Sequence, residues 1–222
     1  MSIRKNIKVI QSEIQKITSQ PVKLVAVTKN RTIKEIHEAI EAGITDIGEN
    51  RIQEAKEKLP KLPKTITKHF IGRLQSNKVR EAVRLFDVIQ SVDSLKLAQK
   101  IDKECEKIGK IMPILIQVNT SDEPQKGGVP IGNASNLIKE ASELKNIQIH
   151  GLMTLAVHSA DENKVRACFR KLKKLFDKIK NSNFEFRTSS FEFLSMGMSE
   201  DYRIAIEEGA NMVRIGSGIF RD

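Results

Sequence analysis

The stretch VKLVAVTK, residues 22–29, decides the fold of this chain. It is a short apolar run rich in Val. The next residues, RTIKEIHEAIEAG at 31–43, have the apolar spacing of an amphipathic helix that ends at Gly43. A buried strand followed by such a helix is the unit of parallel α/β folds. Lys29 then lies at the carboxyl end of the strand, where these folds carry out their chemistry. A lysine at a strand end can also serve only to reach water, so Lys29 needs support from other residues.

The same alternation of strand and helix continues along the chain until eight strands are predicted. The expected strands are residues 22–29, 45–50, 68–72, 87–92, 112–119, 147–155, 191–196 and 211–216. Helices are expected between them, with Ser76 capping the third and Asp93 or Ser94 the fourth. Such alternation predicts a single TIM-type (β/α)₈ barrel. An open doubly wound sheet is the alternative, but the GxGxxG motif expected after its first strand is absent.

The composition fits one folded domain over residues 1–222, with 39% hydrophobic and 30% charged residues. There is no composition shift and no low-complexity linker, and residues 181–190 are expected to form a loop. No apolar run approaches the roughly 20 residues that cross a bilayer. Charges interrupt every apolar stretch near the N-terminus, which is not the pattern of a signal peptide. We therefore expect no membrane partner.

Residues 1–18 predict an extra helix ahead of the barrel. Its isoleucines fall on one helical stripe, at Ile3, Ile7, Ile10, Ile14 and Ile17. A membrane-surface helix or a transit peptide would also be amphipathic. Glu13 and the strict stripe instead favour a helix that packs on its own domain.

The cysteines and histidines predict neither disulfides nor a metal site. Cys105 and Cys168 both lie in predicted helices without CxxC spacing, which favours a reducing, cytoplasmic location. The four histidines are scattered and form no metal-ligand pattern, so we interpret them as core or surface residues: His37, His69, His150 and His158.

The net charge of +10, from 38 basic and 28 acidic residues, raises the alternative of a nucleic-acid partner. The lysines, however, alternate with acids on the outer faces of predicted helices, as in KLKKLFDKIK at 171–180. Only nine Phe and one Tyr are available to stack on bases. We therefore interpret the charge as solvated helix faces and not as a nucleic-acid site, and the basic balance would still favour an anionic small molecule.

Three groups of residues lie at or just after the carboxyl ends of predicted strands and would meet at one end of the barrel. They are Lys29, the Gly48-Glu49-Asn50 segment, and two clusters rich in small residues at 195–199 and 214–218. Taken alone, an asparagine in the position of Asn50 is more often a helix N-cap. Loops after the last two strands of such barrels bind phosphate through backbone N–H groups, although Gly and Ser are also ordinary turn residues. A lysine amine facing a phosphate cradle is what pyridoxal 5′-phosphate (PLP) requires.

The chain resembles the pyridoxal-phosphate homeostasis protein family, single-domain relatives of the alanine racemase barrel. The matching motifs are AVTK (26–29), GENRIQEA (48–55), HFIGRLQSNK (69–78), SVDS (91–94), QVNTSDEPQKGG (117–128), GLMT (151–154), SMGMSEDYRIAIEEG (195–209) and VRIGSGIF (213–220). The resemblance implies that Lys29 holds PLP as a Schiff base, and that Arg214 faces the pyridine nitrogen. It also implies a phosphate site at Ser199, Gly216 and Ser217, and a ring pocket lined by Asn50 and Met153.

The resemblance implies a protein that stores, buffers or delivers PLP, an intracellular role in vitamin B6 homeostasis. A guanidinium only donates hydrogen bonds, so Arg214 would leave the ring nitrogen unprotonated and weaken the ring as an electron sink. We expect no second domain to supply a base, and the only tyrosine in the sequence is Tyr202. The alternative is a slow, racemase-like PLP enzyme acting on amino acids. The expected partners are PLP and the PLP-dependent apo-enzymes that would receive it, and the expected state is a monomer or weak dimer.

Overall fold

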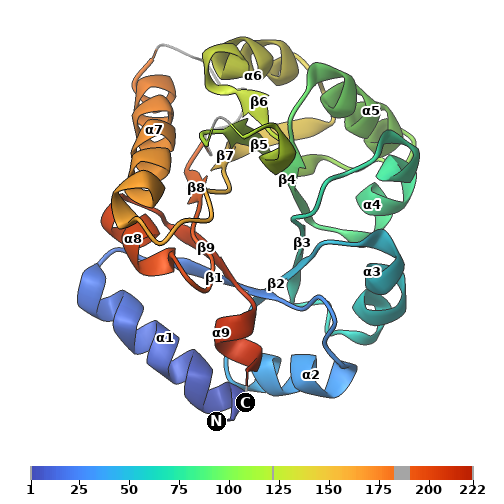
Figure 1. Cartoon of the computed structure of the whole chain (residues 1–222). Coiled ribbons are helices and arrows are strands. Elements are labelled where there is room, and N and C mark those ends of the chain that lie inside the picture. Colours follow the sequence, from blue (N-terminus) through green and yellow to red (C-terminus); the bar gives the residue numbers. More distant parts are fainter. Residues whose placement is uncertain (1, 122, 183–190, 222) are drawn as a thin grey trace.

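The computed structural model describes residues 2–121, 123–182 and 191–221, and within them it confirms the predicted barrel (Figure 1). Eight parallel strands form the wall in chain order, and β9 pairs with β1 to close it. The wall strands are β1 (Lys23–Val27), β2 (Asp46–Glu49), β3 (Thr67–Phe70), β4 (Val88–Val92), β5 (Met112–Asn119), β7 (Ile147–Met153), β8 (Phe193–Ser195) and β9 (Met212–Ile215). The two-residue strand β6 (Val129–Pro130) pairs with the end of β5. Residues 183–190 of the expected loop lie outside the described residues.

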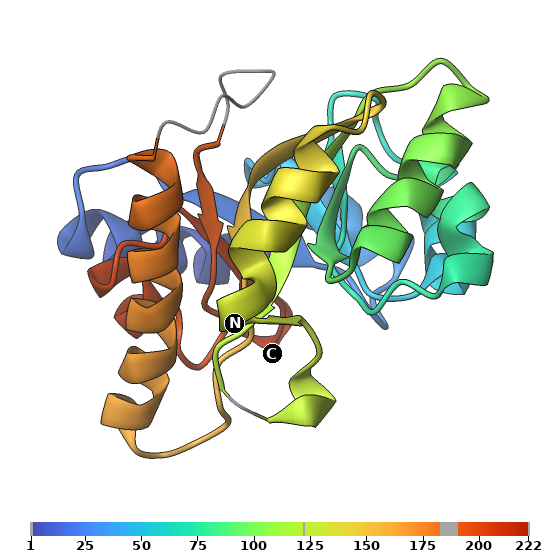
Figure 2. The same ribbon diagram turned by 90° about the horizontal axis from the view of Figure 1, so that it is seen from above.

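Helices cover the outside of the barrel (Figure 1). The α-helices are α1 (Ile3–Ile17), α2 (Ile33–Glu41), α3 (Ile52–Lys58), α4 (Val79–Leu85), α5 (Leu95–Glu106), α6 (Ala134–Ser142), α7 (Glu162–Lys180), α8 (Tyr202–Glu207) and α9 (Ser217–Phe220). Short 3₁₀ helices are η1 (Leu59–Lys61), η2 (Ser76–Lys78), η3 (Pro124–Lys126) and η4 (Ile131–Asn133). Because all wall strands run the same way, their carboxyl ends share one rim. In Figure 2 the connections that leave β5 and β7 extend from this rim, at the lower edge of the view.

The ends of the helices show where local sequence was a reliable guide. Thr32 and Glu35 form the reciprocal hydrogen bonds of a capping box at the start of α2, and Gly43 follows that helix with φ +99°. Ser94 is the N-cap residue of α5, without a side-chain bond to the helix. The predicted cap at Ser76 is wrong. Residues 76–78 form a 3₁₀ turn that runs directly into α4, so Lys78 occupies the cap position.

The N-terminal helix packs on the barrel as predicted. Its buried stripe is Ile3, Ile7, Ile10 and Ile14, and α1 contacts α2, α8 and α9. Asn6 Nδ2 donates to the backbone oxygens of Ile219 and Arg221, both at 2.9 Å, which ties the two ends of the chain together. Glu13 accepts hydrogen bonds from Tyr202 and from Arg203. No helix in the described part of the chain is long and apolar enough to span a bilayer.

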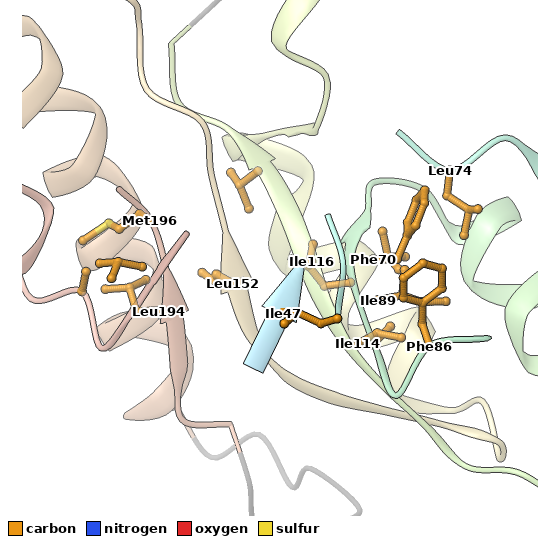
Figure 3. Packing of buried hydrophobic residues seen from close by; sticks show 14 of the residues in the cluster. Ile47, Phe70, Leu74, Phe86, Ile89, Ile114, Ile116, Leu152, Leu194 and Met196 are labelled. Atoms are coloured by element: carbon orange, nitrogen blue, oxygen red, sulfur yellow. The ribbon is translucent and has the colours of Figure 1, made fainter. Parts of the chain in front are cut away.

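The apolar core has an outer and an inner part. The outer part lies between the strands and the helices, and Figure 3 shows Phe70 and Phe86 in it. The centroids of these two rings are 5.2 Å apart, and the ring planes meet at 67°. The inner part is a small cluster on the barrel axis, formed by Val25, Leu115, Met153 and Met212. Cys105 and Cys168 are buried free thiols. Among the described residues, no group of acids, histidines and cysteines is placed to hold a metal ion.

The barrel interior also contains a buried carboxylate. Asp46 accepts hydrogen bonds from His69 Nε2 (2.9 Å), Thr45 Oγ1 (2.8 Å) and Lys23 Nζ (3.1 Å). Burial alone would raise the pKa of Asp46, but these bonds outweigh it and lower the pKa from 3.8 to about 2.

We expect Asp46 to stabilise the fold above pH 4 and to lose that effect in acid. A carboxyl with a folded pKa below its unfolded one contributes stability that disappears as the pH falls through the folded pKa. The shift corresponds to about 2 kcal/mol of unfolding free energy, lost between about pH 4 and pH 2. Urea unfolding at pH 5, 4, 3 and 2 measures it. Asp46→Asn should flatten this part of the pH dependence, and equal slopes for the two proteins would contradict the assignment.

Candidate functional site

Lys29 lies two residues beyond β1, at the carboxyl rim of the barrel. Its side chain is exposed, and within the described part of the chain it makes no hydrogen bond or ion pair. Its neighbours, by contrast, are held firmly. Thr28 is fully buried, and Asn30 adopts a left-handed conformation with φ +58°, which Asn tolerates better than most residues. The amine is therefore free at the end of a fixed turn.

A buried network behind the turn fixes the backbone that carries Lys29. Thr28 Oγ1 donates to Glu49 Oε1 at 2.7 Å, and Lys58 Nζ donates to the Thr28 carbonyl at 2.9 Å. Lys58 also pairs with Glu49 and Glu54, at 3.2 and 3.0 Å. Burial raises the pKa of the Glu49 carboxyl, and Thr28 and Lys58 oppose that shift. The sequence showed no sign of this network, because its residues come from three separate elements.

The cluster of small residues near the C-terminus forms a second part of the rim. Ser199 Oγ accepts hydrogen bonds from the backbone N–H groups of Gly216 (3.3 Å) and Gly218 (3.1 Å). Gly197 has φ +94°, and a Cβ there would lie 2.6 Å from Ala205 Cβ, so only glycine fits the turn. Among described residues, no acceptor takes the Ser199 hydroxyl proton. The proton remains available to a ligand.

Arg214 forms the floor between these two parts. Only 3% of it is exposed; Nη1 donates to Ser195 Oγ at 2.6 Å and Nη2 to the Thr154 carbonyl at 2.9 Å. Burial lowers the pKa of the guanidinium from 12.5 to about 10, and nearby Asp201 opposes the shift. Arg214 therefore stays protonated near neutral pH and can only donate.

These residues line one cavity of about 450 Å³. Its lining is Val27, Lys29, Lys126, Ala156, Val157, His158, Met198, Ser199, Glu200, Asp201, Arg214, Gly216 and Ser217. Five predicted site residues are therefore brought together: Lys29, Ser199, Arg214, Gly216 and Ser217. The volume is in the range typical of small-molecule sites.

Asn50 and Met153 are not part of this lining. Met153 is fully buried in the inner apolar cluster, below the rim. Asn50 follows β2 at the rim, and its Oδ1 is buried without a hydrogen-bond partner among the described residues. An unpaired buried acceptor is costly, so this oxygen is suited to receive a donor from a ligand.

Sequence reasoning missed several residues of the lining. Lys126 lies in the 117–128 motif but received no role; here it is a second amine facing the cavity, with Glu123 at 4.0 Å. Asp201 accepts from the Met198 backbone N–H at 2.6 Å, and burial raises the pKa of its carboxyl. His158 is a surface histidine, as expected, but it lies at the mouth of the cavity. In the sequence, Lys126 and Asp201 are marked only by their positions inside the motifs at 117–128 and 195–209.

A larger hollow of about 1150 Å³ lies at the opposite end of the barrel, between the end of α1 and the amino ends of the strands. Its main charged groups, Lys23 and Asp46, are already paired with each other. The carboxyl-end cavity instead combines a free amine, a buried guanidinium, hydroxyls and backbone N–H groups. That set of donors fits a small anionic ligand with an electrophilic carbonyl group, such as PLP.

The fold and the site together define the class of protein to which this chain belongs. A (β/α)₈ barrel with a lysine after its first strand and an arginine in its last matches the family described as alanine racemase, N-terminal domain, over residues 1–222. Two proteins named pyridoxal phosphate homeostasis protein are similar over nearly the whole chain. The one from Synechocystis sp. is 39% identical over 215 residues, which are 96% of this chain and 97% of the relative. The one from Vibrio alginolyticus is 37% identical over 230 residues, 99% and 97% of the two chains. The chain belongs to the pyridoxal phosphate homeostasis protein family.

Solved structures agree with this assignment. PipY from Synechococcus elongatus, solved with PLP bound, is 33% identical, with a TM-score of 0.87 over 99% of this chain and 100% of PipY. PipY without PLP gives a TM-score of 0.90 over the same shares. An alanine racemase from Clostridium difficile is 18% identical, with a TM-score of 0.75 over 97% of this chain and 55% of the racemase; it shares the fold alone.

Proposed function

We propose that this protein binds PLP in the carboxyl-end cavity and serves in intracellular PLP homeostasis by holding and releasing the cofactor. The observation that carries the proposal is the joint lining of one cavity by Lys29, Arg214 and the Ser199–Gly216–Ser217 cluster. The PLP bound to PipY supports it, because PipY is similar over the whole chain.

Each residue has a distinct role in this proposal. When bound, PLP supplies an aldehyde that condenses with a primary amine, and a dianionic phosphate at the far side of its ring. Lys29 supplies the amine, and Ser199, Gly216 and Ser217 bind the phosphate through hydroxyl and N–H donors. Arg214 donates to the ring nitrogen. Asn50 is assigned to a polar group of the ring through its unpaired Oδ1, and Met153 supports the ring pocket from the inner cluster beneath.

The arrangement favours a carrier over an enzyme. Arg214 cannot give up a proton to the ring, so the ring nitrogen stays a weak electron sink. Tyr202, the only tyrosine, donates its hydroxyl proton to Glu13 of α1, away from the cavity. Burial and the Glu13 bond raise the pKa of this phenol to about 12, which makes it a poor acid–base group at neutral pH.

Absorbance spectra of the purified protein mixed with PLP test the proposal directly. We expect a visible band that sodium borohydride bleaches, and transfer of the bound PLP to a PLP-dependent apo-enzyme on dialysis against it. Racemisation and α-proton exchange of the twenty amino acids should stay at the level of free PLP. Turnover many times faster than free PLP would instead establish the racemase-like alternative.

The setting proposed for this function is cytoplasmic. Two buried cysteines that remain free thiols agree with a reducing compartment. The partners proposed are PLP and the apo-enzymes that receive it, with the protein acting as a monomer or weak dimer. Size-exclusion chromatography with light scattering, across protein concentrations, measures the assembly state.

A further inference from the structure

A continuous chain of buried hydrogen bonds runs through the barrel behind the cavity floor. In order, its members are Arg214, Ser195, Gln90, His69 and Asp46, from β9, β8, β4, β3 and β2. The successive bonds are 2.6, 2.7, 3.0 and 2.9 Å long, and each member is at most 3% exposed. This series of hydrogen bonds therefore joins the Arg214 guanidinium, at the carboxyl rim of the barrel, to the Asp46 carboxylate, near the amino ends of the strands.

The two end members of this series of hydrogen bonds, Arg214 and Asp46, fix the direction of every bond in it. A guanidinium has only donors, so Ser195 Oγ accepts from Arg214 and must give its own proton to Gln90 Oε1. The Gln90 amide nitrogen then faces His69 Nδ1, which must accept. The remaining ring proton lies on Nε2 and is donated to the ionised Asp46, which has only acceptors.

Met212 gives independent support for this direction. Gln90 Nε2 lies 3.3 Å from Met212 Sδ as well as 3.0 Å from His69 Nδ1. A thioether can accept a hydrogen bond but cannot donate one. If the Gln90 amide were flipped, its oxygen would face a sulfur without a proton, and its nitrogen would face Ser195. The surroundings thus allow one orientation of the amide.

We propose that Ser195 and Gln90 are positioning residues that hold the Arg214 guanidinium in one orientation, so that the cavity selects ligands whose aromatic ring carries an unprotonated nitrogen. The proposal rests on the proposed function, since Arg214 must face the ring. Ser195 and the Thr154 carbonyl hold one nitrogen each of the guanidinium fork. Without Ser195, the fork is held at one nitrogen only and can rotate about its last bonds. The guanidinium would then disfavour a protonated ring nitrogen less strongly. A ligand whose ring has no nitrogen would also lose less binding affinity relative to PLP.

The test compares two ligands across four proteins. The ligands are PLP and its carbocyclic analogue, in which C–H replaces the ring nitrogen. The proteins are wild type, Ser195→Ala, Gln90→Leu and Ser91→Ala. Ser91 is a matched control because it neighbours Gln90 in β4, is 3% exposed, and has an Oγ without a hydrogen-bond partner in the described residues. Dissociation constants are measured by titration, and circular dichroism confirms that each protein is folded.

Wild type and Ser91→Ala should prefer PLP over the analogue roughly tenfold to a hundredfold, the effect of one hydrogen bond to a charged group. Ser195→Ala and Gln90→Leu should reduce that preference about fivefold or more. They should also shift the absorption maximum of bound PLP. If Gln90→Leu does not fold, Ser195→Ala decides alone.

Three results would overturn the proposal while leaving PLP binding intact. One is a wild-type preference retained in Ser195→Ala. Another is an equal loss of preference in Ser91→Ala. The third is a wild-type protein that binds both ligands equally. Failure of wild type to bind PLP at all would instead overturn the proposed function.

Discussion

Lys29→Ala will abolish the covalent attachment of PLP, and with it the visible absorbance band of the complex. Lys29 provides a primary amine at the rim of the cavity that no other described residue engages, on a turn fixed by Glu49 and Lys58. Alanine leaves no nucleophile at this position. The phosphate and ring contacts remain, so residual non-covalent binding is expected. Borohydride reduction followed by mass spectrometry of the intact protein should show a PLP adduct in wild type and none in the variant.

Lys126→Ala is the matched control for this prediction. Lys126 is the only other lysine in the cavity lining of the described chain. Unlike Lys29, it does not follow a barrel strand: it is the last residue of η3, and its amine lies near the Glu123 carboxylate. We expect Lys126→Ala to keep the borohydride-trapped adduct. Peptide mapping that finds the adduct on Lys126, or an undiminished adduct in Lys29→Ala, would show that the assignment of the amine is wrong.

Replacing Ser199 and Ser217 together by Ala will weaken PLP binding by roughly a hundredfold to ten-thousandfold. Each hydroxyl that donates to a charged phosphate contributes about 1.5–3 kcal/mol, so two contribute about 3–6 kcal/mol. Ser199 also accepts from the N–H groups of Gly216 and Gly218 and holds that turn in place. Its loss should therefore disturb backbone donors as well. Equilibrium dialysis of PLP against protein that has not been reduced with borohydride gives the dissociation constants.

Unphosphorylated pyridoxal provides the control for the serine pair. It carries the same ring and aldehyde but no phosphate, so wild type and the double variant should bind it with the same affinity. If the affinities for pyridoxal and for PLP fall equally in the variant, the serines maintain the fold of the cavity and do not bind the phosphate. If PLP affinity is unchanged, the phosphate lies against other residues.

Local sequence was sufficient to predict most strands and helices of the barrel, because the hydrophobic pattern that indicates each element extends over only about ten residues. The strand predicted at 112–119 has the same limits as β5 (Met112–Asn119), and the helix expected between the sixth and seventh strands is α7 (Glu162–Lys180). The errors lie at boundaries, where local preferences compete. Ser76 is a good capping residue, yet residues 76–78 form a 3₁₀ turn and Lys78 takes the cap position.

The cavity was predicted in part for the same reason. Lys29, Ser199 and Arg214 lie in or just after strands, and parallel strands bring their carboxyl ends together. Met153 shows the limit of that logic. It ends a strand too, but its side chain belongs to the inner cluster below the rim, a depth that depends on how the strands are staggered in the closed barrel.

By itself, the sequence determined the strand–helix alternation, the closed parallel barrel, and the meeting of a lysine with a cluster of small residues at one rim. These follow from periodicity, which acts between near neighbours in the chain. Only the tertiary structure decided how buried polar groups are paired. Gln90 and Ser195 are 105 residues apart, and Glu49 and Lys58 come from different elements. A polar residue inside a strand carries no local mark of its partner, because that partner is chosen only when the barrel closes and excludes water.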